Sequence, residues 1–175
     1  MDPFSQLFLP PKFDIDGRQL RAAWLRVVAA AHPDATGTVD AASAANDAYR
    51  VLLDPIERAH ALLRRLGHGG VLEDDALRRA LPEGFLVEMM EYRERADAVD
   101  ASDAEGRHEL LSEANGRRDA ALSRIAASFG RLVEGGGDDR SRQSTAADIA
   151  RELNVVRSFD RMIEQLERER GGIVP

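Results

Sequence analysis

Residues 29–40, AAAHPDATGTVD, separate two helical stretches of the sequence with a loop of unusual composition. Pro33 disfavours helical backbone at the residue before it, so the first helix is predicted to end at His32. Asp40 is a good N-cap and is predicted to begin the next helix. Glycine or serine would turn the chain with less chemistry, whereas this loop carries a histidine and a carboxylate. The sequence therefore predicts two helices joined by a loop that exposes His32 and Asp34.

The two flanking stretches have the periodicity of amphipathic helices. Between about residues 16 and 31, apolar side chains recur every 3.6 residues on one face, namely Leu20, Ala23, Trp24, Val27, Val28 and Ala31. The opposite face carries three basic residues and one leucine between them, namely Arg18, Arg21, Arg26 and Leu25. The stretch after the loop has a second apolar stripe, namely Ala41, Ala44, Ala45, Ala48, Tyr49 and Leu52. A helical hairpin is therefore expected.

The composition favours an all-α protein and excludes several functional classes. Strand signals are almost absent, and aromatic residues make up only 5% of the 175 residues. The net charge of −7 argues against nucleic acid as a partner, because phosphate binding needs a basic surface. There is no cysteine, which excludes disulfides and thiolate-bound metals. We see no signal peptide and no membrane span, and we expect a cytoplasmic protein without a cofactor.

The order of segments predicts two domains. A helix from about residue 56 to 66 follows Pro55 and ends before the GHGG sequence at 67–70. We expect a small helical domain at 1–66, a linker at 67–82 and a C-terminal domain at 83–175. The last domain contains three amphipathic stretches near 83–101, 104–134 and 140–170, which suggest an antiparallel three-helix bundle.

The loop and its neighbours resemble a J domain, the domain that defines the DnaJ class of co-chaperones. The His-Pro-Asp tripeptide is followed by NDAYRVLLDPIER at residues 46–58, which supplies the matching positions Asn46, Ala48, Tyr49, Leu52, Asp54, Pro55 and Arg58. The resemblance implies a contact with an ATP-dependent chaperone of the DnaK/HscA class. It assigns that contact to His32, Pro33, Asp34, Arg18, Arg21, Leu25 and Arg26.

The helix expected from about residue 83 has a wider apolar surface than one core contact requires. Phe85, Met89, Tyr92, Ala96 and Val99 share one stripe, and Leu86, Val87 and Met90 lie beside it. In the last helix a second ridge, including Val155, Phe159 and Met162, lies beside the main stripe. Pattern alone leaves two interpretations open. Either these helices touch two neighbours, or the extra residues form an exposed, adaptable binding surface.

Over nearly its whole length the chain is similar to the HscB family, the J-type co-chaperones of iron–sulfur cluster assembly. The similarity lies in the opening DPFSQLFLP at 2–10, in RAHALLRRLG at 58–67 and in FLVEMMEYRE at 85–94. It implies that the C-terminal bundle binds the iron–sulfur scaffold protein IscU and delivers it to the chaperone. The client-binding residues that it implies are Leu86, Val87, Met90, Val155 and Phe159.

Three other functions stay open at this stage. The bundle could bind a different client, or the protein could be a helical adaptor in which the loop is only a turn. An enzyme that uses His32 would need a pocket, and the sequence shows no nucleophile motif, phosphate loop or zinc-ligand spacing. We therefore expect a protein that is not itself an enzyme.

Overall fold

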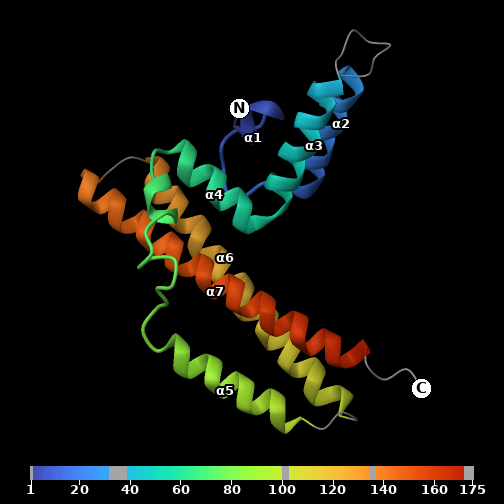
Figure 1. Ribbon diagram of the computed structural model, residues 1–175, viewed down its shortest axis with the longest axis vertical. Coiled ribbons are helices and arrows are strands. Elements are labelled where there is room, and N and C mark those ends of the chain that lie inside the picture. Colours follow the sequence, from blue (N-terminus) through green and yellow to red (C-terminus); the bar gives the residue numbers. More distant parts are fainter. Residues whose placement is uncertain (1, 32–38, 100–102, 135–136, 172–175) are drawn as a thin grey trace. The chain divides into compact units, whose positions relative to one another are not determined.

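Every regular element of the chain is a helix in the computed structural model, which describes residues 2–31, 39–99, 103–134 and 137–171 (Figure 1). The prediction of an all-α protein is confirmed for this part of the chain. The chain divides into two compact units, Met1–Leu72 and Glu73–Pro175. The border falls inside the segment at 67–82 that the sequence predicts as a linker.

A helical hairpin with shorter helices packed around it forms the first unit. Its elements are α1 (Pro3–Gln6), α2 (Gly17–Ala30), α3 (Val39–Leu53), α4 (Pro55–Arg65) and the 3-10 helix η2 (Gly69–Leu72). The hairpin consists of α2 and α3, and both α1 and α4 contact α3. Its fully buried large side chains are Phe4, Leu7, Leu20, Leu52, Leu62, Leu63 and Val71.

Aspartates begin three of these helices. The Asp2, Asp16 and Asp54 side chains each accept hydrogen bonds from two backbone N–H groups in the first turn of the following helix. Such caps satisfy donors that would otherwise lack a partner at the helix end. The prediction of Asp40 as the N-cap of the next helix is wrong, because α3 begins at Val39 and Asp40 already lies in its first turn.

A polar bond and a ring contact join the two helices of the hairpin. The indole Nε1 of Trp24 donates to Oδ1 of Asn46 over 2.8 Å. The Trp24 ring also lies 4.9 Å from the Tyr49 ring, centroid to centroid. Asn46 and Tyr49 therefore hold α3 against α2.

Phe8 has an unusual backbone conformation in the turn after α1. Its φ of 54° lies in the left-handed region, and it is the one non-glycine residue with positive φ in the described chain. This conformation costs about 1–2 kcal/mol for a residue with a Cβ atom. Leu7 and Leu9 on either side are buried, whereas the Phe8 side chain is 84% exposed.

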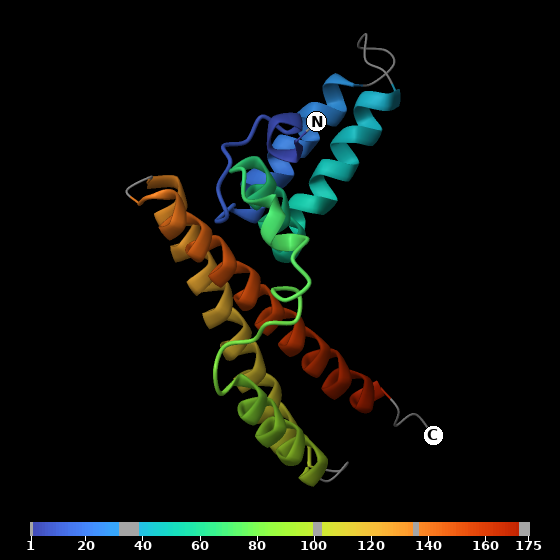
Figure 2. The ribbon, with the colours of Figure 1, turned by 60° about the vertical axis from the view of Figure 1, so that its left-hand side comes forward.

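Two long antiparallel helices dominate the second unit. They are α6 (Ala104–Glu134) and α7 (Asp139–Gly171), which lie side by side in both ribbon views (Figures 1 and 2). Their shared core includes Ile125, Phe129, Ile149, Leu153 and Val156. Arg124 of α6 makes two 2.9 Å hydrogen bonds to the Glu152 carboxylate of α7, a bidentate geometry that sets the register of the pair.

The third helix, α5 (Phe85–Ala98), is held to the other two by aromatic rings and ion pairs. Phe159 of α7 contacts the rings of Phe85 and Tyr92 edge to face, at centroid distances of 5.7 and 5.6 Å. Arg95 of α5 also pairs with Glu113 of α6 over 2.7 Å. The arrangement is the expected three-helix bundle.

Both ends of the predicted linker are packed. At its start, Val71 is only 2% exposed, in the first unit. Further along, the side-chain amide of Asn154 in α7 donates to the carbonyl oxygens of Leu77 and Ala80 over 2.9 and 2.8 Å. The irregular segment before α5 therefore belongs to the second unit.

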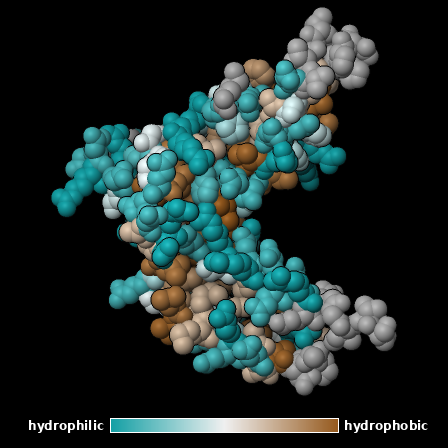
Figure 3. Space-filling view, viewed as in Figure 1, coloured by the Kyte–Doolittle hydropathy of each residue, from teal (hydrophilic) through white to brown (hydrophobic). Residues whose placement is uncertain are grey.

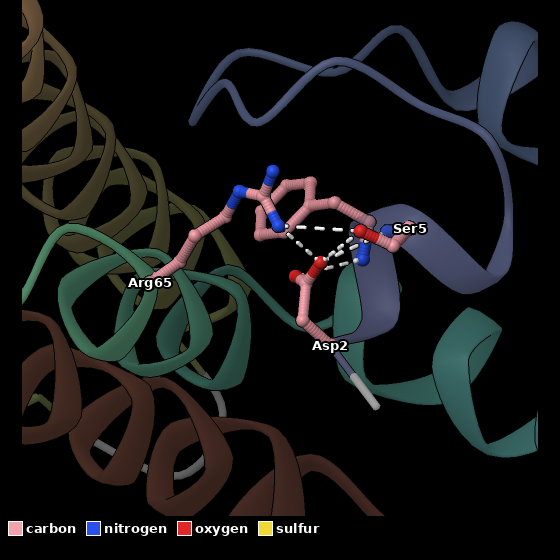
Figure 4. A network of polar contacts seen from close by, with 4 residues as sticks. Asp2, Ser5 and Arg65 are labelled. Carbon is pink, nitrogen blue, oxygen red and sulfur yellow. Dashed lines mark hydrogen bonds and ion pairs between the residues drawn. The ribbon is translucent and has the colours of Figure 1, made fainter.

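Asp2 offers a test of the capping and ion-pair contacts in the first unit. Besides capping α1, it accepts a hydrogen bond from Ser5 Oγ and pairs with Arg65 of α4 (Figure 4). We expect Asp2→Ala to lower the free energy of unfolding by about 1–2 kcal/mol, from the lost cap and the partly exposed ion pair. Fluorescence of Trp24, the only tryptophan, reports on this unit during urea unfolding. Asp47→Ala, which removes an exposed pair with Arg50, should change the free energy by less than about 0.5 kcal/mol.

The effect of Asp2→Ala should also depend on pH. Burial of the carboxyl group opposes its ionisation, but hydrogen bonds from Ser5 and Phe4 and the charge of Arg65 outweigh this and lower the pKa of Asp2. Its stabilisation is therefore complete above the unfolded-state pKa of about 3.9 and is lost as pH falls through the lower folded-state pKa. The difference in the free energy of unfolding between wild type and Asp2→Ala should be the same at about pH 5 and pH 7, and it should become smaller in stronger acid. A difference that persists unchanged in acid would contradict this role.

Candidate functional site

One face of α2 is basic and open to solvent. Arg18, Arg21 and Arg26 are exposed, and Leu25 between them is 49% exposed. The helix contains no acidic residue, although the whole chain carries a net charge of −7. None of the three arginines pairs with a carboxylate of the described residues, and Arg26 only donates to the Ala22 carbonyl oxygen. This face can therefore attract an acidic surface through unpaired guanidinium groups.

The loop that was predicted to contact the chaperone, with His32, Pro33 and Asp34, lies outside the described residues. Its two flanks are described. Helix α2 ends at Ala30 with Ala31 as the C-cap, as expected for a helix that stops before His32. Because α3 begins at Val39, the loop joins the ends of two packed helices.

A patch of large apolar side chains lies on the exposed face of α5. Leu86, Val87 and Met90 are 65%, 60% and 64% exposed, and we call these three residues the α5 patch. Figure 3 shows hydrophobic side chains gathered on the surface over the start of α5. Of the neighbouring stripe, Phe85 and Tyr92 are buried as predicted, whereas Met89, Ala96 and Val99 are half-buried. The α5 patch is therefore surplus to the core, and the interpretation of these three residues as a second core contact is wrong.

Two residues that were expected to extend this surface on the last helix do not lie at the surface. Val155 is 3% exposed and Phe159 is 1% exposed. The reason is that α7 touches more than one neighbour, and Phe159 fills the contact with Phe85 and Tyr92 of α5. The expectation that Val155 and Phe159 present a binding surface is therefore corrected, because both are core residues of this unit.

A groove next to the α5 patch is formed by α5 and α7. It has a volume of about 400 Å³, and its lining includes Leu86, Met89, Met90, Arg93, Arg161 and Met162. Methionine side chains are flexible and adapt to differently shaped partners. The groove and the α5 patch can therefore receive apolar side chains of another protein.

The charged groups between α5 and α6 act structurally. Burial, together with the neighbouring Glu113 carboxylate, raises the pKa of Tyr92 to about 12. A hydrogen bond from Arg95, helped by Tyr92, lowers the pKa of Glu113. Near neutral pH the phenol therefore stays protonated and the carboxylate stays ionised. Among the described residues no group of three His, Cys, Asp or Glu side chains could hold a metal ion, and no helix could span a membrane.

Sequence reasoning missed three contributors to the surfaces described above. Arg93 and Arg161 line the α5–α7 groove, but they come from different helices, and no spacing within one helix brings them together. The strong exposure of Phe8 was also missed, because its position in the DPFSQLFLP segment does not reveal the left-handed backbone. A left-handed φ cannot be read from a residue that normally avoids it.

The fold matches two solved structures over almost the whole chain. The chaperone HscB from Vibrio cholerae has a TM-score of 0.70 at 22% identity, covering 99% of this chain and 100% of that one. The human co-chaperone protein HscB has a TM-score of 0.73 at 20% identity, covering 97% and 82%. At these identities the likeness establishes a common fold.

Sequence similarity is stronger to two curated relatives, each described as a co-chaperone protein HscB homolog. The Ralstonia nicotianae protein is 33% identical, covering 90% of this chain and 89% of its own length. The Bordetella avium protein is 34% identical, covering 99% and 98%. Residues 81–166 also match the family model of the HSCB C-terminal oligomerisation domain. These matches place the protein among the co-chaperones. More particularly, the chain belongs to the HscB family.

The contrast between the α5 patch and the core ring of Phe159 can be measured as stability. Phe159→Ala should lower the free energy of unfolding by about 3–5 kcal/mol, because it leaves a cavity between α5 and α7. Met90→Ala, at an exposed position, should change it by less than about 0.5 kcal/mol. Urea unfolding followed by circular dichroism at 222 nm measures both. Equal losses for the two variants would show that Met90 is part of the core.

Proposed function

We propose that the first unit acts as a J domain that stimulates ATP hydrolysis by a chaperone of the DnaK/HscA class. Membership of the HscB family supports this role, as does the basic face of α2 beside the His-Pro-Asp loop. We further propose that the second unit binds the scaffold protein IscU and delivers it to that chaperone. The protein would work in the cytoplasm on another protein's ATPase site, without a cofactor and without catalysing a reaction itself.

The chaperone contact depends on the loop and on α2. The Asp34 carboxylate would accept a charge-assisted hydrogen bond from an arginine of the chaperone. Pro33 would hold the loop shape, and His32 would orient the loop and touch the partner. The guanidinium groups of Arg18, Arg21 and Arg26, with Leu25 between them, would meet an acidic surface. Such charge complementarity raises the association rate more than the affinity.

The observation that carries the client contact is the α5 patch. Three large apolar side chains, each at least 60% exposed, share one helix face and adjoin a groove of about 400 Å³. Exposure of clustered apolar side chains to water is typical of a protein-binding surface. Burial of this patch against IscU would release water and provide most of the binding free energy.

The two contacts would act together because they belong to one chain. A client bound to the second unit and a chaperone bound to the first are held at a high effective concentration. The chaperone then meets IscU far more often than it would in free solution. This is a means of delivery that needs no chemical step by the co-chaperone.

The chaperone role can be tested by single-turnover ATP hydrolysis. Wild-type protein should accelerate hydrolysis by the cognate DnaK/HscA-class chaperone, and IscU should increase this acceleration further. Asp34→Asn is nearly the same size but cannot form the charged hydrogen bond, so it should abolish the acceleration. If the variant accelerates hydrolysis as well as wild type, the loop is only a turn and the protein is a helical adaptor.

The client role can be tested by charging the α5 patch. Met90→Glu keeps a good helix former but places a charge in the apolar contact, so IscU affinity measured by calorimetry should fall at least about tenfold. Stimulation of the chaperone without IscU should stay unchanged. Val133→Glu is the matched control, because Val133 on α6 is 59% exposed in the same unit and does not line the groove. Unchanged IscU binding by Met90→Glu would indicate a different client or a different surface.

A further inference from the structure

Phe8 combines two unfavourable features in a single residue. Its backbone is left-handed, with φ at 54°, and its aromatic side chain is 84% exposed to water. A glycine would adopt the same turn without steric strain and would expose no apolar ring. Neither feature stabilises the fold, and strain of this kind is concentrated at functional sites.

The local structure holds the Phe8 ring outside the core. The backbone N–H of Phe8 donates to the Ser5 carbonyl oxygen over 3.3 Å, and that of Leu9 donates to Phe4 over 2.9 Å. Leu7 and Leu9 are 1% and 8% exposed, so both neighbours of Phe8 are fixed in the core. The turn therefore fixes the backbone of Phe8 and directs its side chain away from the core.

The ring borders a shallow apolar groove of the same unit. The groove has a volume of about 360 Å³, and its lining includes Leu7, Phe8, Ala23, Arg26, Val27 and Ala30. The alanine side chains let another chain approach the α2 backbone closely. The guanidinium group of Arg26 is the one charged group among the residues that line it. Such a groove is suited to an apolar side chain that is flanked by a carboxylate.

The basic residue of this groove also belongs to the exposed face of α2. Arg26 pairs with no carboxylate of the described residues, and α2 as a whole carries three arginines and no acid. Charge complementarity therefore calls for an acidic occupant. The lining residues Ala30 and Ala31 directly precede His32 in the sequence, so the groove adjoins the start of the loop proposed to contact the chaperone.

We propose that Phe8 and the groove beside Arg26 bind an apolar side chain, next to a carboxylate, on the surface of the ATP-hydrolysing chaperone. This inference rests on the proposed function, since it extends the contact made by the arginines of α2. The apolar contact of the ring slows dissociation of the complex. The arginines supply long-range electrostatic attraction that speeds association. IscU is not the expected occupant, because the α5 patch proposed for it belongs to the second unit.

Two substitutions separate the ring from the strained backbone. Phe8→Gly removes both the ring and the backbone strain. Because glycine adopts positive φ without steric cost, the thermal midpoint of unfolding should stay the same or rise. Phe8→Ala removes the ring and keeps the strain, so its midpoint should not exceed that of Phe8→Gly. Both variants should bind the DnaK/HscA-class chaperone about tenfold more weakly than wild type, measured by surface plasmon resonance. Trp24 fluorescence verifies that the first unit remains folded.

The salt dependence of chaperone binding separates the apolar contribution of Phe8 from the electrostatic contribution of Arg26, and a matched control tests its specificity. The effect of Phe8→Gly should persist at high salt, whereas the effect of Arg26→Gln should fade as ions screen the charge. Leu53→Ala removes another exposed apolar side chain of the first unit, 55% exposed and outside the groove, and should bind as wild type does.

Binding by the Phe8 variants and ATPase stimulation by Asp34→Asn test the groove and the J-domain role separately. If Phe8→Gly and Phe8→Ala bind normally while Asp34→Asn abolishes ATPase stimulation, the groove is not a chaperone site and the J-domain role stands. A lower midpoint together with weaker binding in Phe8→Gly would show that the ring is structural, which overturns the inference. If Asp34→Asn stimulates like wild type, the proposed function fails and this inference fails with it.

Discussion

The position of Phe159 between two rings of α5 is the contact on which the orientation of α5, and with it the exposed patch, depends. Phe85 and Tyr92 lie seven positions apart, about two helical turns, so both rings can meet the same neighbour. Once these two rings face α7, the rotation of α5 about its own axis is set. At 3.6 residues per turn, Leu86, Val87 and Met90 must then point away from the core. The exposed apolar patch is thus a geometric consequence of an internal aromatic contact.

The first unit applies the same principle with different side chains. Leu20 and Ala23 turn one side of α2 into the core, and the bond from Trp24 to Asn46 fixes the pairing with α3. The arginines are left on the outside as a result. In both units a buried contact orients one helix, and the residues proposed to bind partners lie on the face that this orientation leaves free.

Much of this arrangement could be predicted from sequence because it depends on local rules. Helix limits follow from local signals such as Pro33 and Pro55, and the structure places most of them within one or two residues of the expectation. The burial of Phe85 and Tyr92 was also predicted correctly, since burial on one helix follows a fixed period. The α2 face with Arg18 and Arg21 was identified in the same way.

The errors come from contacts between distant segments. The pattern of α7 contains two apolar ridges, and nothing within that helix tells which ridge meets a neighbour. The HscB resemblance assigned Val155 and Phe159 to a binding surface, although the docking of α5 buries Phe159. The grooves need two elements at once, and the backbone of Phe8 depends on Leu7 and Leu9 being buried around it.

The Asn154 amide has a consequence for how the chain tolerates change. It binds the carbonyl oxygens of Leu77 and Ala80 just before α5 begins, and it is itself only 8% exposed. Residues inserted or deleted between Leu72 and Asp74 lie upstream of this attachment and of the turn that Asp74 holds with Ala76 and Leu77, so the register of α5 on α7 is preserved. A pulling force transmitted along the chain from the first unit would act on the hydrogen bonds of Asn154 to Leu77 and Ala80 before it reached Phe85. The position of the α5 patch therefore does not depend on the length of the chain that joins the two units.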